Sequence, residues 1–452
     1  MQIRKPSKKR TNPQCSLLAK ILYVLLVVWL VGVFYMRNSL EGNSNNKASI
    51  EESSGQQLTN KKLPNQQRHR RSSTTQDPYY GWQPPSHAND DTSSCTLSDC
   101  FKEKGTFETH SQCKKCDDDP NEFANIPDVP PDWVPDASML HNMMLDGTDQ
   151  NGNPWPPSLP QDYCAPLGVF GGPHDDNKRL FDEVPIRGMP PDNSASGPTI
   201  FCGVYTMEVN HAGNIRAMRE TWAPHCDGFV AFSTATDPRI PALSVDHEGP
   251  EEYNNMWQKS RSIWRYIGEH YLDQFDYFIL GGEDLLVIPD NLRAYLKGLN
   301  MSPEEDLFAG RRFKGYGPNN YFNSGGAGYV LSRGTLRKYY ETGYDHPECN
   351  PHRHTAMEDV MIAECLRKVL NIGLTDTRDE QQHERFHPFG PGNHYAWRPS
   401  PPGAKKDWYE DYNAEWGLKQ GIECCAPDSV SFHYIKKPAT VRHLWSLLYN
   451  CS

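Results

Sequence analysis

The stretch that decides the fold reads Tyr277-Phe278-Ile279-Leu280-Gly281-Gly282-Glu283-Asp284. Its four apolar residues predict a buried strand, the two glycines predict a turn, and the two acids follow at the carboxyl end of the strand. Ligands of open α/β sheets bind at such strand ends, and hard divalent cations prefer carboxylate oxygens. Glu283 and Asp284 are therefore candidate metal ligands, and a pair of solvated loop acids is the alternative.

The segments around this stretch alternate between strand and helix patterns. Strands are predicted at 199–206, 228–233 and 277–280, and helices are predicted at 214–222 and 253–272. Alternation of this kind is typical of an α/β fold with a mostly parallel central sheet that helices cover on its faces.

The 452-residue chain divides by composition into five parts. We predict, in order, a cytoplasmic tail, a transmembrane signal anchor, a disordered stem, a Cys/Pro-rich lumenal segment and the α/β domain, at 1–16, 17–36, 37–94, 95–195 and 196–452. The apolar span is long enough to cross a bilayer, and the basic residues before it place the N-terminus in the cytosol. A cleaved signal peptide is the alternative. The net charge of -11 argues against a nucleic-acid-binding protein.

The cysteines fit a chain that lies mostly beyond the membrane. Of 13 cysteines only Cys15 precedes the apolar span, and the remaining even number predicts disulfides in an oxidising compartment. Cys95, Cys100, Cys113 and Cys116 crowd into one short segment, which predicts a small disulfide-stapled unit. Zinc or redox chemistry at the last two is the alternative, and the pairing stays open.

Two further motifs carry candidate site residues. A glycine-rich run includes Gly325 and Gly326, which permit close approach of the backbone to a ligand; a tight turn is the alternative. Thr355-x-x-Glu358 fits a capping box at the start of a helix. Asp359 is not needed for that cap, and a carboxylate there beside a cleft is suited to accept a proton from an incoming hydroxyl.

Two histidines lie among aromatic residues, His387 after Phe386 and His433 after Phe432. A histidine in such surroundings is more often a packed, hydrogen-bonded residue than a ligand. Imidazole is nevertheless a suitable partner for a carboxylate at a Mn²⁺ site.

The order of these pieces resembles that of the core 1 β-1,3-galactosyltransferases (T-synthases), within the Fringe-like β-1,3-glycosyltransferase family. The resemblance extends over about 199–436 and includes a single apolar span and polar stem before the domain. It rests on nine motifs in register, which are Arg216-Ala-Met-Arg219-Glu-Thr221-Trp222, 269–272, 290–293, 310–314, 324–332, Glu358-Asp359, 386–389, Cys424-Cys425 and 430–434.

The resemblance implies a GT-A fold in a Golgi type II membrane protein. It implies an inverting, Mn²⁺-dependent enzyme that moves galactose from UDP-galactose to the 3-hydroxyl of N-acetylgalactosamine on Ser or Thr of a glycoprotein. Asp359 would be the general base, and Asp284 with His433, or alternatively His387, would bind the metal. The nucleotide-sugar site would include Arg216, Arg219, Trp222, Glu283, Gly325 and Gly326.

The sequence departs from this family at the metal motif. T-synthases carry Asp-Asp-Asp where this chain has Gly282-Glu283-Asp284, so the first carboxylate is missing and the second is longer. Two alternatives therefore stay open, a non-catalytic lumenal chaperone or glycan-binding relative, and a β-1,3-glycosyltransferase with another donor or acceptor. The oligomeric state, a homodimer included, also stays open.

Overall fold

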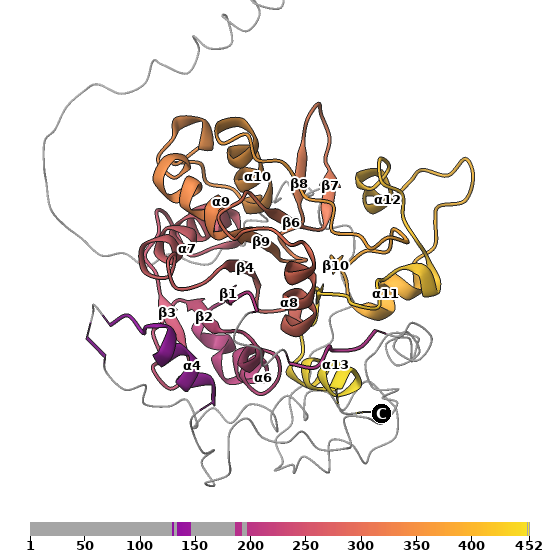
Figure 1. Ribbon diagram of the computed structural model, residues 1–452. Helices are drawn as coiled ribbons and strands as arrows, with labels where there is room; N and C mark the ends of the chain where they lie inside the picture. The colour runs from indigo at the N-terminus through magenta and orange to yellow at the C-terminus, as the bar shows by residue number, and fades with distance from the viewer. Residues whose placement is uncertain (1–128, 131–132, 146–185, 192–196, 450, 452) are drawn as a thin grey trace, which may run out of the picture. The chain divides into compact units, whose positions relative to one another are not determined.

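The structure is a computed structural model that describes residues 129–130, 133–145, 186–191, 197–449 and 451 (Figure 1). The predicted tail, anchor, stem and cysteine cluster lie outside the described residues, as does most of the Cys/Pro-rich segment. Among the residues that are described, no helix is long and apolar enough to span a membrane.

A six-stranded sheet forms the centre of the fold, with the strand order β3-β2-β1-β4-β9-β6. Its strands are β1 (Ile200–Tyr205), β2 (Gly228–Ser233), β3 (Ala242–Ser244), β4 (Tyr277–Gly282), β6 (Phe308–Gly310) and β9 (Tyr329–Ser332). β3, β2, β1 and β4 run parallel to one another, and β9 runs antiparallel to both β4 and β6. The predicted α/β fold with a mostly parallel central sheet is confirmed.

Two smaller sheets flank the central one. One contains β5 (Leu286–Val287), β10 (Phe386–His387) and β11 (Ser431–Phe432), and the other contains β7 (Arg312–Lys314) and β8 (Tyr321–Asn323). The helices are α4 (Ala137–Leu145), α6 (Arg216–Arg219), α7 (Met256–His270), α8 (Pro289–Gly298), α9 (Arg333–Lys338), α10 (Glu358–Val369), α11 (Pro391–Ala396), α12 (Trp408–Tyr412) and α13 (Pro438–Tyr449).

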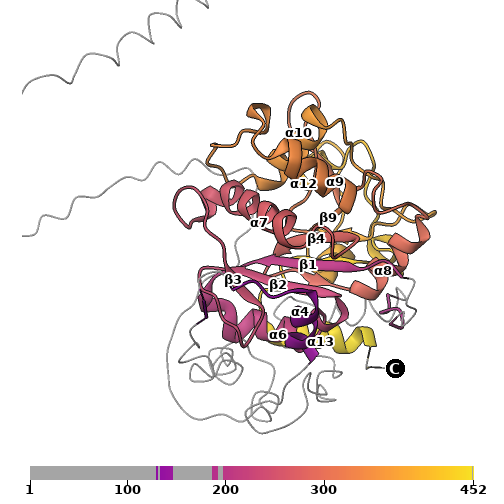
Figure 2. The same ribbon diagram turned by 60° about the vertical axis from the view of Figure 1, so that its left-hand side comes forward.

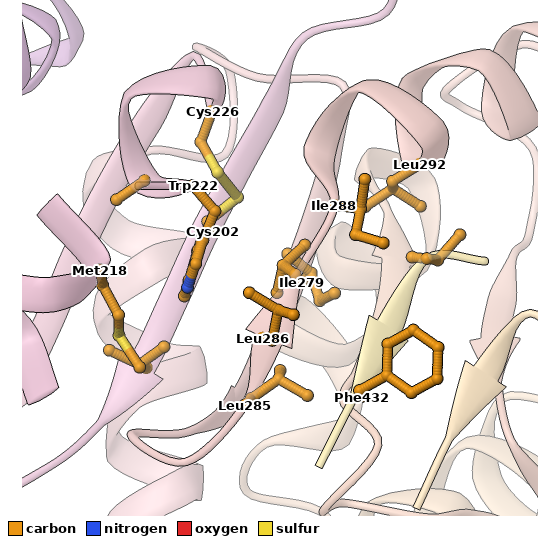
Figure 3. Close-up of a cluster of buried hydrophobic side chains, with 14 of the residues drawn as sticks. Cys202, Met218, Trp222, Cys226, Ile279, Leu285, Leu286, Ile288, Leu292 and Phe432 are labelled. Atoms are coloured by element: carbon orange, nitrogen blue, oxygen red, sulfur yellow. A yellow bond between two sulfur atoms is a disulfide. The ribbon is translucent and has the colours of Figure 1, made fainter. Parts of the chain in front are cut away.

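Helices cover both faces of the central sheet. Figure 2 shows α7, α9 and α10 on one face and α4, α6 and α13 on the other. Because strand side chains alternate between faces, β1 sends Phe201 into the core cluster under α7 and Cys202 into the cluster around α6. Figure 3 shows the second cluster, in which Trp222 packs near Met218 and Cys202.

Three disulfides join cysteines in the described part of the chain. They pair Cys202 with Cys226, Cys349 with Cys365, and Cys424 with Cys425. The first ties β1 to the segment that leads into β2. The second ties the loop before α10 to α10 itself, and so holds in place the turn that precedes Asp359.

Two local predictions need correction. β4 continues through Gly281 and Gly282, so the turn begins at Glu283 rather than at the glycines. A side chain at Gly281 would put its Cβ 2.5 Å from Leu285 Cδ2, so the buried Leu285 could not keep its present position. The helix predicted at 214–222 is shorter as an α-helix, because a π-helical turn at His211–Ile215 precedes α6.

Candidate active site

A cavity of about 360 Å³ lies where β1 and β4 end. Its wall includes Tyr205 and Thr206 from the end of β1, Glu283 and Asp284 from the turn after β4, and Asp359 from the start of α10. Parallel neighbours in a sheet end at the same edge, and this edge is where ligands of such sheets bind. The structure therefore brings the three predicted acidic site residues together in one pocket.

Asp284 is paired with His433. The Asp284 Oδ1 atom lies 3.2 Å from His433 Nε2, and the other ring nitrogen, Nδ1, lies 3.2 Å from the Pro388 carbonyl oxygen. Because a carbonyl oxygen only accepts, the Pro388 contact assigns a proton to Nδ1, and Nε2 faces the carboxylate, to which it donates when the imidazole carries both protons. Burial alone would raise the pKa of Asp284, but His433 and Lys436 outweigh burial and lower it.

Glu283 accepts hydrogen bonds from two asparagine side chains. Its Oε1 atom accepts a hydrogen bond of 3.2 Å from Asn210 Nδ2, and its backbone carbonyl accepts one of 3.1 Å from Asn214 Nδ2. Burial, together with the neighbouring charge of Asp284, raises the pKa of the Glu283 carboxyl. The two adjacent acids thus have opposite shifts, and Asp284 is the one that stays ionised more readily.

Asp359 occupies the first turn of α10. Its Oδ2 atom accepts a 2.9 Å hydrogen bond from the backbone N–H of Gly325, and its Oδ1 atom accepts one of 2.8 Å from the N–H of Val360. Burial raises the pKa of Asp359 to about 6, against these backbone hydrogen bonds, which lower it. A carboxylate with this pKa on a pocket wall has the properties of a general base.

The predicted capping box at Glu358 is wrong. The residue that precedes α10 is Met357, and no side chain caps this helix. Glu358 is instead buried, with 4% of its surface exposed, and its Oε2 atom accepts a 2.9 Å hydrogen bond from the Tyr329 hydroxyl. Burial, with the charge of Asp359 beside it, raises the pKa of Glu358 well above its usual value.

Gly325 and Gly326 line the pocket and make room for two of its side chains. A Cβ atom at Gly325 would lie 2.1 Å from Glu358 Oε1, and one at Gly326 would lie 2.3 Å from His433 Cε1. The glycine-rich run is therefore required for the approach of Glu358 and His433. Whether it also contacts a nucleotide-sugar stays a prediction.

The structure does not bring Arg216, Arg219 and Trp222 to the pocket wall. Trp222 is fully buried in the core cluster around α6, where its ring packs edge-on against Phe229. Arg216 Nε donates to Glu220 Oε1 at 2.9 Å. Arg219 donates to two backbone carbonyls, those of residues 143 and 239. These three residues stabilise the packing of α6, so the structure gives no support for their predicted nucleotide contacts.

His387, the alternative metal ligand, also lies away from the pocket wall. It is fully buried, its ring stacks on Phe432 with the centroids 4.4 Å apart, and its Nε2 atom lies 3.0 Å from Ser429 Oγ. Burial lowers the pKa of His387 well below its usual value. The structure therefore favours His433 over His387 as the partner of Asp284.

Sequence reasoning missed Lys259, Lys436 and Tyr434, which also line the pocket. Lys259 is 6% exposed, and its Nζ atom donates to the Thr206 carbonyl at 2.8 Å and to Glu251 Oε1 at 2.6 Å. Tyr434 has φ of 60°, which is strained for a bulky residue and is found more often at functional sites. The signal for Lys259 was a lysine on the buried side of an amphipathic helix.

Comparison with known proteins agrees with this arrangement. A family model described as Fringe-like matches residues 195–388. Glycoprotein-N-acetylgalactosamine 3-beta-galactosyltransferase 1 of Xenopus laevis is 32% identical over 266 residues, which cover 57% of this chain and 71% of that protein. Human chondroitin sulfate synthase 3 is 26% identical over 220 residues, 43% of this chain and 24% of that protein. Mouse beta-1,3-glucosyltransferase is 24% identical over 230 residues, which cover 50% of this chain and 44% of that protein. The chain belongs to the core 1 β-1,3-galactosyltransferases of the Fringe-like family.

Proposed function

We propose that this protein is an inverting transferase that moves galactose from UDP-galactose to the 3-hydroxyl of N-acetylgalactosamine on Ser or Thr of a glycoprotein, with a β-1,3 linkage. The Xenopus relative, whose name gives that acceptor sugar and that bond, supports the substrates. The observation that carries the mechanism is that Asp359 and Asp284 line one cavity, where burial raises the pKa of Asp359 to about 6. The two aspartates have environments suited to different tasks.

Asp359 is the proposed general base. Its carboxylate accepts the proton of the acceptor 3-hydroxyl as that oxygen attacks the anomeric carbon of galactose. The new bond joins the acceptor oxygen to the sugar, and the bond between the sugar and the β-phosphate oxygen breaks on the opposite side. The Gly325 and Val360 N–H groups hold the carboxylate during this step.

The leaving diphosphate is proposed to lie at the other end of the pocket, near Asp284. Lys259 and Lys436 line the cavity and act electrostatically on Glu283 and Asp284 respectively, so they would provide positive charge for phosphate oxygens there. In the described part of the chain, no group of three or more His, Cys, Asp or Glu residues is placed to hold a metal ion.

The pair formed by Asp284 and His433 fits a Mn²⁺ ion that shares its ligands with a substrate. Divalent ions in phosphate-transfer sites use one or two protein ligands, with water and phosphate oxygens as the others. His433 also has the backbone partner on Nδ1 that metal-binding histidines usually have. When bound, Mn²⁺ would neutralise the charge that develops on the diphosphate.

We further propose that the protein is a Golgi membrane protein with its catalytic domain in the lumen. The apolar segment 17–36 with its basic flank supports the anchor. The disulfides in the structure are of the kind that persist in an oxidising compartment. A protease-protection assay on sealed microsomes tests this orientation, which predicts that the domain is protected until detergent is added.

One observation favours a second candidate, a non-catalytic relative that binds glycans or acts as a chaperone. The turn formed by Gly282, Glu283 and Asp284, here called the metal corner, has one acid fewer than the family motif because residue 282 is glycine. Glu283 in turn accepts a hydrogen bond from Asn210. Such a protein would keep the pocket and lack turnover.

A single assay separates the two candidates. The full-length protein in detergent is given UDP-galactose, UDP-glucose, UDP-N-acetylglucosamine or UDP-glucuronic acid, with a GalNAc-peptide, in Mn²⁺ or in EDTA. We expect galactose transfer in Mn²⁺, with a β-1,3 linkage by NMR. UDP binding by calorimetry without any transfer or donor hydrolysis would favour the non-catalytic relative, and transfer of another sugar would change the proposed donor.

A further inference from the structure

The ends of β1 and β4 place Tyr205 directly beside Gly282. The two residues are register partners in a parallel pair, so their side-chain positions lie on the same face of the sheet. A Cβ atom built on Gly282 would lie 3.1 Å from Tyr205 Cε2 and 3.6 Å from Tyr205 Cζ. A side chain at 282 would therefore begin in tight contact with the phenol ring, which would have to shift by a few tenths of an ångström.

The same position is close to the metal corner. The Cβ atom at Gly282 would lie 3.2 Å from Asp284 Oδ1, the oxygen that faces His433. A side chain at 282 would thus begin between the Tyr205 ring and Asp284, in tight contact with both.

Tyr205 also has three acids around it on the pocket wall. Asp284, Glu358 and Asp359 all act on its hydroxyl electrostatically, and all four residues line the cavity. A phenol is protonated at neutral pH, so it adds a hydrogen-bond donor here where an acid would add a further carboxyl group to these three.

We propose that Tyr205 takes the place of the missing carboxylate at position 282 and, with Gly282, sets how tightly the pocket holds a divalent cation. Tyr205 is a positioning residue: its ring excludes a second carboxylate from the corner and leaves Asp284 as the acid that faces the cation. This inference rests on the proposed function, because it assumes that UDP binds here with a divalent cation. It predicts that residues 205 and 282 are energetically coupled.

The coupling has a definite sign. Asp at 282 in the presence of Tyr205 meets the ring, so Gly282→Asp alone is expected to weaken binding of UDP with Mn²⁺. Tyr205→Ala alone opens space and adds no ligand. Combined, the two changes provide a carboxylate with room to reach the cation, and an added carboxylate ligand tightens divalent-cation binding by at least about tenfold.

The experiment compares wild type, both single variants and the double variant as full-length proteins. Calorimetry measures the affinity for Mn²⁺ at saturating UDP and for UDP at saturating Mn²⁺, and thermal melts show that each variant is folded. We expect the double variant to bind Mn²⁺ at least about tenfold more tightly than wild type, while Gly282→Asp alone binds it more weakly. A matched double variant, Tyr205→Phe with Gly282→Asp, keeps the ring and should show no gain.

The outcomes are distinguishable from failure of the proposed function. If wild type binds no UDP in Mn²⁺, the proposed function fails. If wild type binds UDP but Gly282→Asp alone gains as much as the double variant, the ring is not in the way and this inference is wrong. Additive effects of the two changes, or an equal gain with Phe at 205, would overturn it as well.

Discussion

Two pairs of adjacent acids, Glu283-Asp284 and Glu358-Asp359, line the same pocket and differ in their chemistry. In each pair the glutamate is bound by the protein, to Asn210 in the first and to Tyr329 in the second. In each pair burial raises the pKa of the glutamate. The identity of the residue therefore does not decide its role, since the same Glu-Asp dipeptide occurs at both places.

The two aspartates are what separates the pairs. The pKa of Asp284 is lowered against burial, because His433 and Lys436 favour its charged form. The pKa of Asp359 is raised to about 6 by burial, and its opposing contacts are backbone N–H groups. His433 and Lys436 thus favour the charged form of Asp284. Asp359 has backbone N–H groups as its contacts instead, and its raised pKa suits it to take up a proton.

The largest expected effect comes from one matched substitution in the second pair. Asp359→Asn removes the base and should lower kcat by roughly 10²–10⁴-fold, with UDP affinity in Mn²⁺ nearly retained. Glu358→Gln makes the same chemical change one residue earlier and should cost less than about tenfold, because a protonated glutamate and a glutamine are similar in shape. Steady-state kinetics and UDP calorimetry measure both. Full turnover by Asp359→Asn would show that the base lies elsewhere.

The corresponding change in the first pair should affect binding before turnover. Asp284→Asn is expected to weaken UDP binding in Mn²⁺ by roughly 10–100-fold, since it removes the charged ligand of the cation. In EDTA the same variant should bind UDP almost as wild type does. Calorimetry in the two buffers provides the comparison, and an equal loss in both would mean that Asp284 acts without a cation.

Substitution of the two histidines tests which one binds the cation, with an expected change of about tenfold in UDP affinity in Mn²⁺. His433→Gln is expected to weaken UDP binding in Mn²⁺ and to leave the melting temperature almost unchanged, because His433 lies at the pocket wall. His387→Gln should lower the melting temperature and leave UDP binding in Mn²⁺ almost unchanged, since His387 is fully buried against Phe432. A variant of His387 that is folded and has lost cation-dependent binding would restore it as a candidate ligand.

The smallest expected effect is a dependence of kcat on pH, which we assign to Asp359. A general base works only when ionised, so activity should rise with pH through the pKa of Asp359, about 6. At saturating Mn²⁺ and UDP-galactose, kcat at pH 5 should be roughly tenfold below its plateau above pH 7. Initial rates measured across pH 5–8 test this rise in kcat. A flat profile would contradict the assignment of Asp359 as the titrating base.

Much of the site could be predicted from local sequence. The apolar run before Glu283, the strand–helix alternation and the position of Asp359 at the start of a helix are short-range signals. They were enough to predict the α/β sheet and to make Asp284 and Asp359 candidates, whereas His433 was named through the resemblance. The structure places all three residues on one pocket wall. Local signals also misled, because Thr355-x-x-Glu358 has the spacing of a capping box without its geometry.

Contacts between distant segments could not be predicted in this way. Trp222 lies in a motif that resembles a nucleotide-site region, yet it is buried on the face of the sheet that carries α6. Lys259 reaches the pocket only because α7 packs beside the end of β1 and Lys259 Nζ can bind the Thr206 carbonyl. The pattern of α7 puts Lys259 on the buried side of the helix, but no pattern within either segment shows what its side chain contacts.

By itself, the sequence determined β1, β2 and β4, the mostly parallel character of the sheet and the chemical types of the site residues, because hydrophobic periodicity and strand-end acids are properties of short segments. The tertiary structure alone decided which histidine faces Asp284, which acid has a raised pKa, and that Tyr205 lies over Gly282. These depend on strand register, burial and charges brought together from residues far apart in the chain, and such terms arise only once the chain is packed.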